Sequence, residues 1–279
     1  MKIGMDVRTW DKIAKTLMSV DKMAKFEYLG DGSDEGVLIT TSSPGYSFCS
    51  VHIARGWAEA AKMDGIAQEK FGIDLSDLRA ALQKVKGSSK SDSVVLESGG
   101  DNLLLVGNGS EIIDKRRFEE NEQRLNLGEF VRFRMGGSKV KRILNEIYST
   151  DDTVKITLGE YRINTKIGPD TSITEGYGVC FWKSEADEIF VSNEPLTSSN
   201  IKLEEFPDGF TTEYFVEPLT DIINEIGTAR KESMEISIGP QTPIEMKFRL
   251  AETVFVEYTQ VPKKVVELPE VEELEKGNL

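Results

Sequence analysis

Two helix-like patterns of apolar residues occur in the same order in both halves of the chain. This repeat constrains the fold more than any other feature of the sequence. Spacings of three and four residues place each set on one face of a helix. The first stripe reappears 130 residues further on: Trp10, Ile13, Ala14 and Leu17 correspond to Val140, Ile143, Leu144 and Ile147. The second reappears 141 residues further on: Leu78, Ala81, Leu82 and Val85 correspond to Leu219, Ile222, Ile223 and Ile226. One such match is weak evidence, but two in the same order predict two copies of one plan.

The expected helices begin and end at recognisable signals. The first is expected over about Arg8–Val20, and the second from about Ser76 to a stop at Gly87. The third follows a cap at Ser138, and the fourth begins with Pro218 and ends at Gly227. Alternating apolar residues predict the strands between them. The clearest are Lys2–Val7, the region 26–53, Ser93–Glu97, Asn102–Val106, Phe130–Met135, Val154–Leu158, Tyr161–Ile163, Val179–Trp182, Ile189–Val191, Met234–Ile238, Ile244–Phe248 and Val254–Tyr258.

A polar stretch between the two copies has the composition of a linker. After Phe118 its only apolar residues are Leu125 and Leu127. We therefore expect an N-terminal domain over 1–117, a connector over 118–129, a C-terminal domain over 130–266 and an acidic tail over 267–279.

Composition excludes several classes of protein. No apolar run approaches the ~18 residues that a membrane span needs, and the N-terminus has no signal-peptide pattern. Cys49 and Cys180 lie far apart without metal-ligand spacing, so reduced thiols and an intracellular location are expected: cytoplasmic and nucleoid-associated, or nuclear in a eukaryote. His52 is the only histidine and falls in an alternating strand pattern, which argues against histidine-based catalysis and metal binding. We expect no catalytic residues, metal or cofactor.

Basic residues collect on the expected helices although the chain has a net charge of −14. They could be ordinary solvated helix faces. Alternatively, they could form one positive surface that contacts phosphates without reading bases. The candidate DNA-binding residues are Arg8, Lys12, Lys15, Arg79, Lys84, Lys86, Lys139, Lys141 and Arg142, with Arg230 and Lys231 just past the fourth helix.

Several segments are similar to the PCNA family of DNA sliding clamps, of archaeal or archaeal-virus type, over roughly residues 1–267. They are Gly36–Thr40, Phe71–Leu75, Ser93–Glu97, Thr242–Phe248 and Val256–Pro262. The resemblance implies an α+β clamp fold of two similar domains, with helices lining a central hole and antiparallel sheets outside. It also implies a processivity factor that encircles double-stranded DNA, as a homotrimer, independently of base sequence.

The resemblance further implies a pocket for short peptides from DNA polymerase, the clamp loader, ligase or nuclease in replication and repair. The matching positions are Ser42, Tyr46, Leu125, Leu127, Pro243, Thr259, Val261 and Pro262. Ser42 and Thr259 stand where the family usually has apolar or aromatic residues, so the preferred peptide is expected to differ. Leu125 and Leu127 could line this groove or simply pack on their own domain.

Pairing of strand edges between subunits is expected to close the ring, because unpaired edges are a liability. The expected edges are about Glu111–Arg117 and Val179–Lys183. The interface candidates are Ile113, Lys115, Arg116, Arg117, Phe181 and Glu185. Two alternatives remain: an accessory or checkpoint subunit of a heteromeric ring, and a carboxylate-dependent hydrolase on a β-rich scaffold.

Overall fold

The computed structural model describes residues 2–29, 36–54, 70–87, 93–117, 130–167, 170–182, 188–192, 198–199, 209–225 and 233–263. The first half contains β1 (Lys2–Asp6), α1 (Val7–Met18), β2 (Met23–Leu29), β3 (Gly36–Ser43), β4 (Ser47–Ala54), β5 (Lys70–Asp74), α2 (Leu75–Val85), β6 (Ser93–Gly99), β7 (Asn102–Val106) and β8 (Ser110–Asp114). The second half contains β9 (Val131–Gly136), α3 (Gly137–Tyr148), β10 (Thr153–Ile167), β11 (Asp170–Trp182), β12 (Glu188–Ser192), β13 (Ser198–Ser199), β14 (Phe210–Phe215), α4 (Val216–Glu225), β15 (Ser233–Ile238), β16 (Ile244–Ala251) and β17 (Val254–Gln260).

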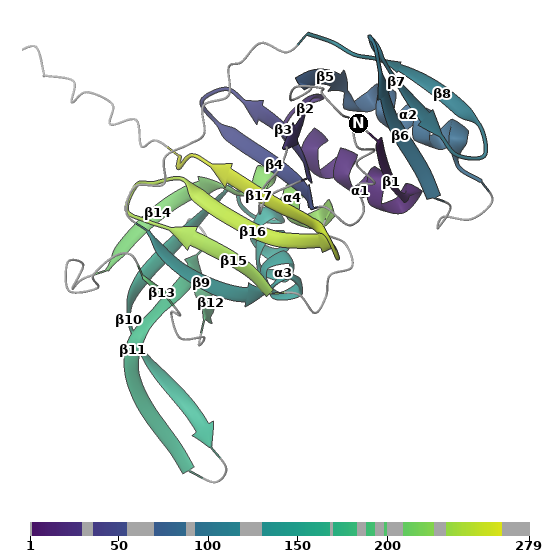
Figure 1. Ribbon diagram of the computed structural model, residues 1–279. Coiled ribbons are helices and arrows are strands. Elements are labelled where there is room, and N and C mark those ends of the chain that lie inside the picture. The colour runs from purple at the N-terminus through teal and green to yellow at the C-terminus, as the bar shows by residue number, and fades with distance from the viewer. Residues whose placement is uncertain are drawn as a thin grey trace, which may run out of the picture.

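Three antiparallel sheets organise these strands (Figure 1). Each half has a four-stranded sheet, in the orders β1-β6-β7-β8 and β12-β11-β10-β14. The third sheet has nine strands in the order β13-β9-β15-β16-β17-β4-β3-β2-β5 and contains strands of both halves. The halves meet where β17 pairs with β4, from Val254↔Ile53 to Gln260↔Ser47. A continuous hydrogen-bonded sheet therefore joins them.

The helices lie on one side of the nine-stranded sheet, behind it in Figure 1. Helix α1 contacts both α2 and α4, and α3 contacts α4. The predicted apolar stripes face the core: Trp10, Ile143 and Leu219, for example, are buried. Burying one such large apolar side chain contributes about 1.5–3 kcal/mol, so the repeated stripes hold the helix layer against the sheets. No helix in the described segments has the length and apolar character needed to cross a membrane.

Two predicted helix starts are wrong in detail. Helix α3 begins at Gly137 with Gly136 as its N-cap, and no side chain caps it, so Ser138 is already inside the first turn. Helix α4 begins at Val216, and Pro218 is its third residue. Proline fits there because the first four N–H groups of a helix have no intrahelical partner. The predicted stop at Gly227 lies outside the described residues.

The largest departure from the predicted strands is in β10 and β11. The two short strands predicted at Val154–Leu158 and Tyr161–Ile163 are one strand, and β11 begins well before Val179. Strands β5 and β14 were not predicted as strands. The expected connector 118–129 and tail 267–279 fall outside the described residues, so the domain boundaries stay predictions.

Candidate functional site

The exposed side of the helix layer carries most of the predicted DNA-binding residues. Arg8 on α1 and Arg142 on α3 are exposed, and neither has an ion pair or hydrogen bond in the described part of the chain. Lys12 and Lys139 occupy the same helices with partial exposure. These side chains extend from the helices away from the buried stripes, as the sequence pattern predicts. Arg230 and Lys231 lie outside the described residues.

Asp11 lies among these cations and binds two of them. Its carboxylate accepts from Lys15 Nζ at 3.0 Å and from Arg79 Nε at 3.0 Å. Partial burial opposes the ionised carboxylate, but hydrogen bonds from Lys15 and Arg79 outweigh that effect and hold the pKa of Asp11 below its usual value. Asp11 therefore ties α1 to α2 while it cancels part of their positive charge.

Other predicted basic residues also have partners within the subunit. Lys84 Nζ lies 3.0 Å from the Glu111 carboxylate on β8, and Lys86 hydrogen-bonds to Gln83. Lys141 Nζ donates to the Asn224 carbonyl of α4 at 3.3 Å. Among the described candidates, Arg8 and Arg142 have neither an ion pair nor a hydrogen bond, whereas Lys86 and Lys141 bind neutral groups and keep their full positive charge.

Helix α4 interrupts the basic surface, because its described side chains include the acids Glu217 and Asp221 and no lysine or arginine. Tyr148 Oη on α3 donates to Glu217 at 3.3 Å. Burial raises the pKa of Asp221, and the nearby Glu217 charge raises it further. The layer thus has basic α1, α2 and α3 beside an acidic α4.

One end of the nine-stranded sheet brings the described residues of the predicted peptide pocket together. Ser42 and Thr259 lie in one cross-strand row, each opposite Phe48. The Val261 N–H donates to the Tyr46 carbonyl at 2.9 Å, and Ile244↔Gln260 pairing brings the neighbouring Pro243 and Val261 close. The Tyr46 ring lies against the Phe215 ring, with centroids 6.1 Å apart. Leu125 and Leu127 lie outside the described residues.

Thr259 gives this end of the sheet an unusual polar atom. The residue is 4% exposed, and its Oγ1 has no hydrogen-bond partner in the described structure. A buried hydroxyl without a partner destabilises the fold. Thr259 therefore places an unsatisfied polar atom just beneath this end of the sheet.

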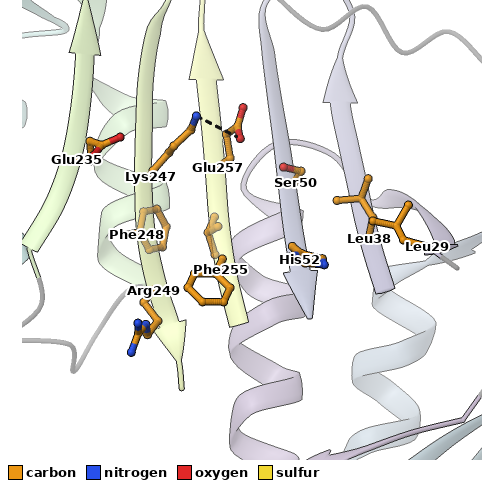
Figure 2. A pocket seen from close by; sticks show the side chains of 11 residues that line it. Leu29, Leu38, Ser50, His52, Glu235, Lys247, Phe248, Arg249, Phe255 and Glu257 are labelled. Atoms are coloured by element: carbon orange, nitrogen blue, oxygen red, sulfur yellow. Dashed lines mark ion pairs between the residues drawn. The ribbon is translucent and has the colours of Figure 1, made fainter. Parts of the chain in front are cut away.

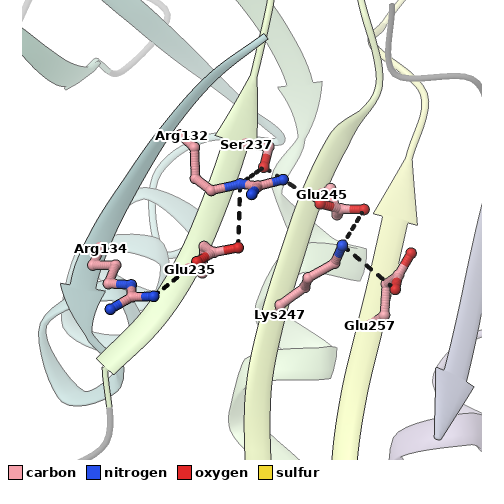
Figure 3. A network of polar contacts seen from close by, with 7 residues as sticks. All are labelled: Arg132, Arg134, Glu235, Ser237, Glu245, Lys247 and Glu257. Carbon is pink, nitrogen blue, oxygen red and sulfur yellow. Dashed lines mark hydrogen bonds and ion pairs between the residues drawn. The ribbon is translucent and has the colours of Figure 1, made fainter. Parts of the chain in front are cut away.

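A charged network crosses the same sheet face beside that cluster (Figure 3). Glu235 pairs with Arg132 at 3.2 Å and with Arg134 at 3.3 Å. Lys247 lies between Glu245, at 3.0 Å, and Glu257, at 3.6 Å. Burial raises the pKa of Glu245, and Lys247 only partly offsets it. These carboxylates are engaged in ion pairs that connect β9, β15, β16 and β17.

Next to the network, an open groove of about 520 Å³ crosses the β17–β4 junction between the halves (Figure 2). Phe255, His52 and Leu38 lie opposite one another on adjacent strands. Arg249 lies over the Phe255 ring, with its Cζ atom 5.4 Å from the centroid. The single histidine is thus part of a wall that mixes apolar, acidic and basic side chains.

The predicted subunit edges need one correction. Strand β8 is an edge of its sheet, as predicted. The predicted partner edge at Val179–Lys183 is wrong, because β11 is an interior strand that pairs with β10 and β12, and β12 is the edge. Phe181 is 1% exposed, because its side chain faces the hydrophobic core of its own half.

Ile113 is also wrong as an apolar interface residue, because it is 2% exposed and faces the core of its own half. Lys115 donates to Ser98 Oγ at 2.7 Å and to the Gly100 carbonyl at 2.8 Å. Arg116 lies 3.4 Å from Asp77. Both are engaged within the subunit. Arg117 is exposed, and Glu185 lies outside the described residues.

The exposed apolar residues of this edge are Ile112 and Leu104, which sequence reasoning missed. They lie opposite one another on β8 and β7 and are 66% and 37% exposed. Alternation showed that one of Ile112 and Ile113 must face outward, but the pattern alone did not show which one.

Comparison with known proteins supports one fold. No protein-family model matches the sequence, and no curated protein shows significant similarity to it. Among solved structures, one similar chain is the PCNA of A. fulgidus, described as bound to the C-terminal region of FEN-1. It has a TM-score of 0.73 and 14% sequence identity, and the match covers 94% of this chain and 98% of that one. The chain has the sliding-clamp fold. The clamp of Thermococcus kodakaraensis (TM-score 0.65, 15% identity) and a PCNA2–PCNA3 complex from Sulfolobus tokodaii (0.63, 20%) each cover 94% of this chain and 99% of their own. The expected α+β clamp architecture is confirmed.

Proposed function

We propose that this protein is a DNA sliding clamp, a non-enzymatic ring subunit that encircles duplex DNA and tethers replication enzymes to it. One observation carries the proposal: the helices of both halves form a single layer with exposed cations, in a chain of net charge −14. Phosphates dominate the affinity of proteins for DNA, so an acidic protein that binds DNA must separate its charges in this way. The clamp fold over nearly the whole chain agrees with it.

The DNA-facing residues in this proposal are those of α1, α2 and α3, foremost Arg8 and Arg142. Long cationic side chains position a protein on phosphates without reading bases, so binding is independent of sequence. Topology, rather than tight adhesion, keeps the ring on DNA. A cytoplasmic or nuclear location near the chromosome is part of the same proposal.

Ring closure in this proposal joins β8 of one copy to β12 of the next. Both are edge strands of four-stranded sheets, and pairing removes both open edges. Exposed Ile112 on β8 supplies an apolar contact at the junction. Light scattering of the purified protein tests closure: a mass of three subunits supports it, and a strictly monomeric protein at micromolar concentration contradicts it.

The cluster of Ser42, Tyr46, Pro243, Val261 and Pro262 at one end of the nine-stranded sheet is the proposed site for partner peptides. An aliphatic and an aromatic anchor would dominate the binding energy there. Ser42 is partly exposed and gives the site a polar group, whereas the Thr259 hydroxyl is buried beneath it. Titration with a fluorescent clamp-binding peptide tests the site. Pro243→Ser should weaken binding while the ring stays assembled, and equal affinities would place partners elsewhere.

The decisive experiment for the function is a polymerase processivity assay on circular primed DNA with a clamp loader. Product length should increase when the protein is added and loaded. Linearising the template is the matched control, because a topologically held ring slides off the ends. Equal retention on circular and linear DNA would contradict encirclement.

A heteromeric ring is the second candidate, because one structural neighbour is a complex of PCNA2 and PCNA3. In that case the protein alone would not reach the mass of three subunits, but would do so with a second clamp chain. The hydrolase alternative has less support, because Glu235 and Glu257, the carboxylates lining the groove, are held in ion pairs.

A further inference from the structure

The β10–β11 hairpin extends far beyond the sheet that contains its base (Figure 1). The two strands pair continuously from Lys155↔Trp182 to Ile167↔Asp170. Strand β14 pairs with β10 only over Thr153–Leu158, and β12 pairs with β11 only over Val179–Trp182. From Gly159↔Gly178 to the tip, the hairpin is a two-stranded ribbon about 27 Å long at ~3.4 Å per residue. We call residues 159–178 the arm.

An isolated two-stranded ribbon is marginally stable in water, and its open backbone groups invite pairing with other chains. Within the described part of the chain, both edges of the arm lack a neighbouring strand. A ribbon of this length therefore indicates a contact that the single subunit does not supply.

The base of the arm lies next to the proposed subunit junction. The sheet order is β12-β11-β10-β14, so the arm continues the two strands directly behind the edge strand β12. Strands in a sheet are about 4.8 Å apart. A neighbouring copy joined at β12 would thus lie within about 10 Å of the base of the arm.

On the opposite side of the same junction, the subunit has an uncovered apolar patch formed by Leu104 and Ile112. The two side chains face away from the core, whereas Leu103, Leu105 and Ile113 on the same strands are buried. Pairing between β8 and β12 would cover the edge at Ile112. Leu104 lies one strand behind that edge, so its burial requires a segment that lies over the outer face of the sheet.

We propose that the arm of one subunit lies over β7 and β8 of the neighbouring copy and covers its Leu104–Ile112 patch. The inference rests on the proposed ring, and it assigns the arm to assembly rather than to DNA or partner enzymes. A second copy is the occupant because both unsatisfied surfaces flank the same junction, one on each side.

The first test shortens the arm. Residues 160–177 are replaced by Asn-Gly, a two-residue hairpin turn that joins the paired Gly159 and Gly178. The companion variant is Leu104→Ser, which leaves the buried core intact. Each should weaken assembly at least about tenfold when the ring is diluted and its mass is followed by light scattering. The combined variant should be no weaker than the more affected single variant, because both changes remove the same interaction.

Cross-linking tests the contact directly and does not depend on the folding of a shortened chain. Leu104→Cys is combined with one cysteine in the arm, at Arg162, Asn164 or Lys166 on one face or at Ile163 or Thr165 on the other. The native Cys49 and Cys180 are buried and do not compete. Mild oxidation should produce covalent dimers with one face of the arm and not with the other.

The outcomes separate this inference from the proposed function. A wild-type protein that assembles neither alone nor with a second clamp chain contradicts both. An assembled ring whose stability is unchanged by arm shortening, or that yields no cross-link from either face, overturns the inference alone. Loss of loading onto DNA or of peptide binding with unchanged assembly would also overturn it, by assigning the arm to a different partner.

Discussion

At the scale of single residues, Asp11 has two opposing effects on the helix layer. Its carboxylate binds Lys15 and Arg79 and so fastens α1 to α2. The same carboxylate offsets one unit of the positive charge that these two cations would otherwise present to DNA in front of the helices. Stability and DNA affinity should therefore respond to this residue in opposite directions.

Asp11→Asn is predicted to lower the free energy of unfolding at pH 7 by no more than about 1 kcal/mol, because solvent screens these pairs. The pKa of Asp11 is below its usual 3.8 in the fold, so its contribution is present above that value and lost as pH falls through the folded-state pKa. The free energies of unfolding of the two proteins, measured in urea, should thus differ at pH 7 and converge only as the pH falls well below 3.8. DNA affinity at low salt should increase, and a decrease would show that Asp11 mainly positions the cations.

Substitution by valine should affect the stability of the fold differently at two buried threonines. Thr259→Val removes a buried hydroxyl without a partner, so stability should be unchanged or rise by up to about 1 kcal/mol. Thr212 Oγ1 donates to the Gly239 carbonyl at 2.8 Å and accepts from the Gln241 N–H at 3.1 Å. Thr212→Val should therefore cost about 1–3 kcal/mol. Denaturant unfolding compares the two, and equal losses would show that Thr259 has a partner.

At the scale of elements, β8 shows how adjacent residues in a strand can differ completely in solvent exposure. Side chains alternate between the two faces, so Ile112 points to solvent and Ile113 to the core. A one-residue error in phase exchanges their roles, which is why the expectation of Ile113 at the interface is wrong. Helices are less prone to this error, because stripes such as Trp10, Ile13 and Leu17 leave only one face to bury.

Ile112→Ser is predicted to weaken subunit assembly while the thermal unfolding of the diluted monomer stays close to wild type. Ile113→Ala is predicted to lower the free energy of unfolding by about 2–5 kcal/mol, because it leaves a cavity among buried residues. Size-exclusion chromatography with light scattering and calorimetry measure the two effects. The assignment of faces fails if Ile113→Ala disturbs only assembly.

Strand order is the part of the fold that the sequence could not predict. Periodicity identifies β11 through Val179, Cys180 and Phe181, but nothing local shows that β12 pairs outside it. The arm escapes prediction because Gly159 interrupts an apolar alternation and so resembles the end of a strand, whereas backbone pairing continues through it. The cluster of Ser42, Tyr46, Pro243 and Thr259 was assigned by resemblance, since these residues are distant in sequence and meet only through the nine-stranded sheet.

At the scale of the whole molecule, the distribution of charge matters more for DNA binding than the net charge does. The chain is strongly acidic, yet α1 and α3 each carry three cations and one acid. The sheet side balances its cations in ion pairs such as Glu235–Arg132 and Lys247–Glu245. Net repulsion from DNA on the outside, with attraction limited to the helices, would favour one orientation of the subunit relative to the duplex.

The combined variant Arg8→Glu and Arg142→Glu should therefore impair loading and sliding more than any change elsewhere on the helices. Both side chains lack partners in the described structure, so reversal places acids where phosphates would lie. Low-salt DNA affinity should fall, and the slope of log affinity against log salt should become shallower by roughly one unit for each phosphate that is no longer neutralised. The matched control is Lys84→Glu, whose cation is already paired with Glu111 and should matter less. Wild-type processivity in the double variant, with the ring intact by light scattering, would show that DNA does not lie against this helix layer.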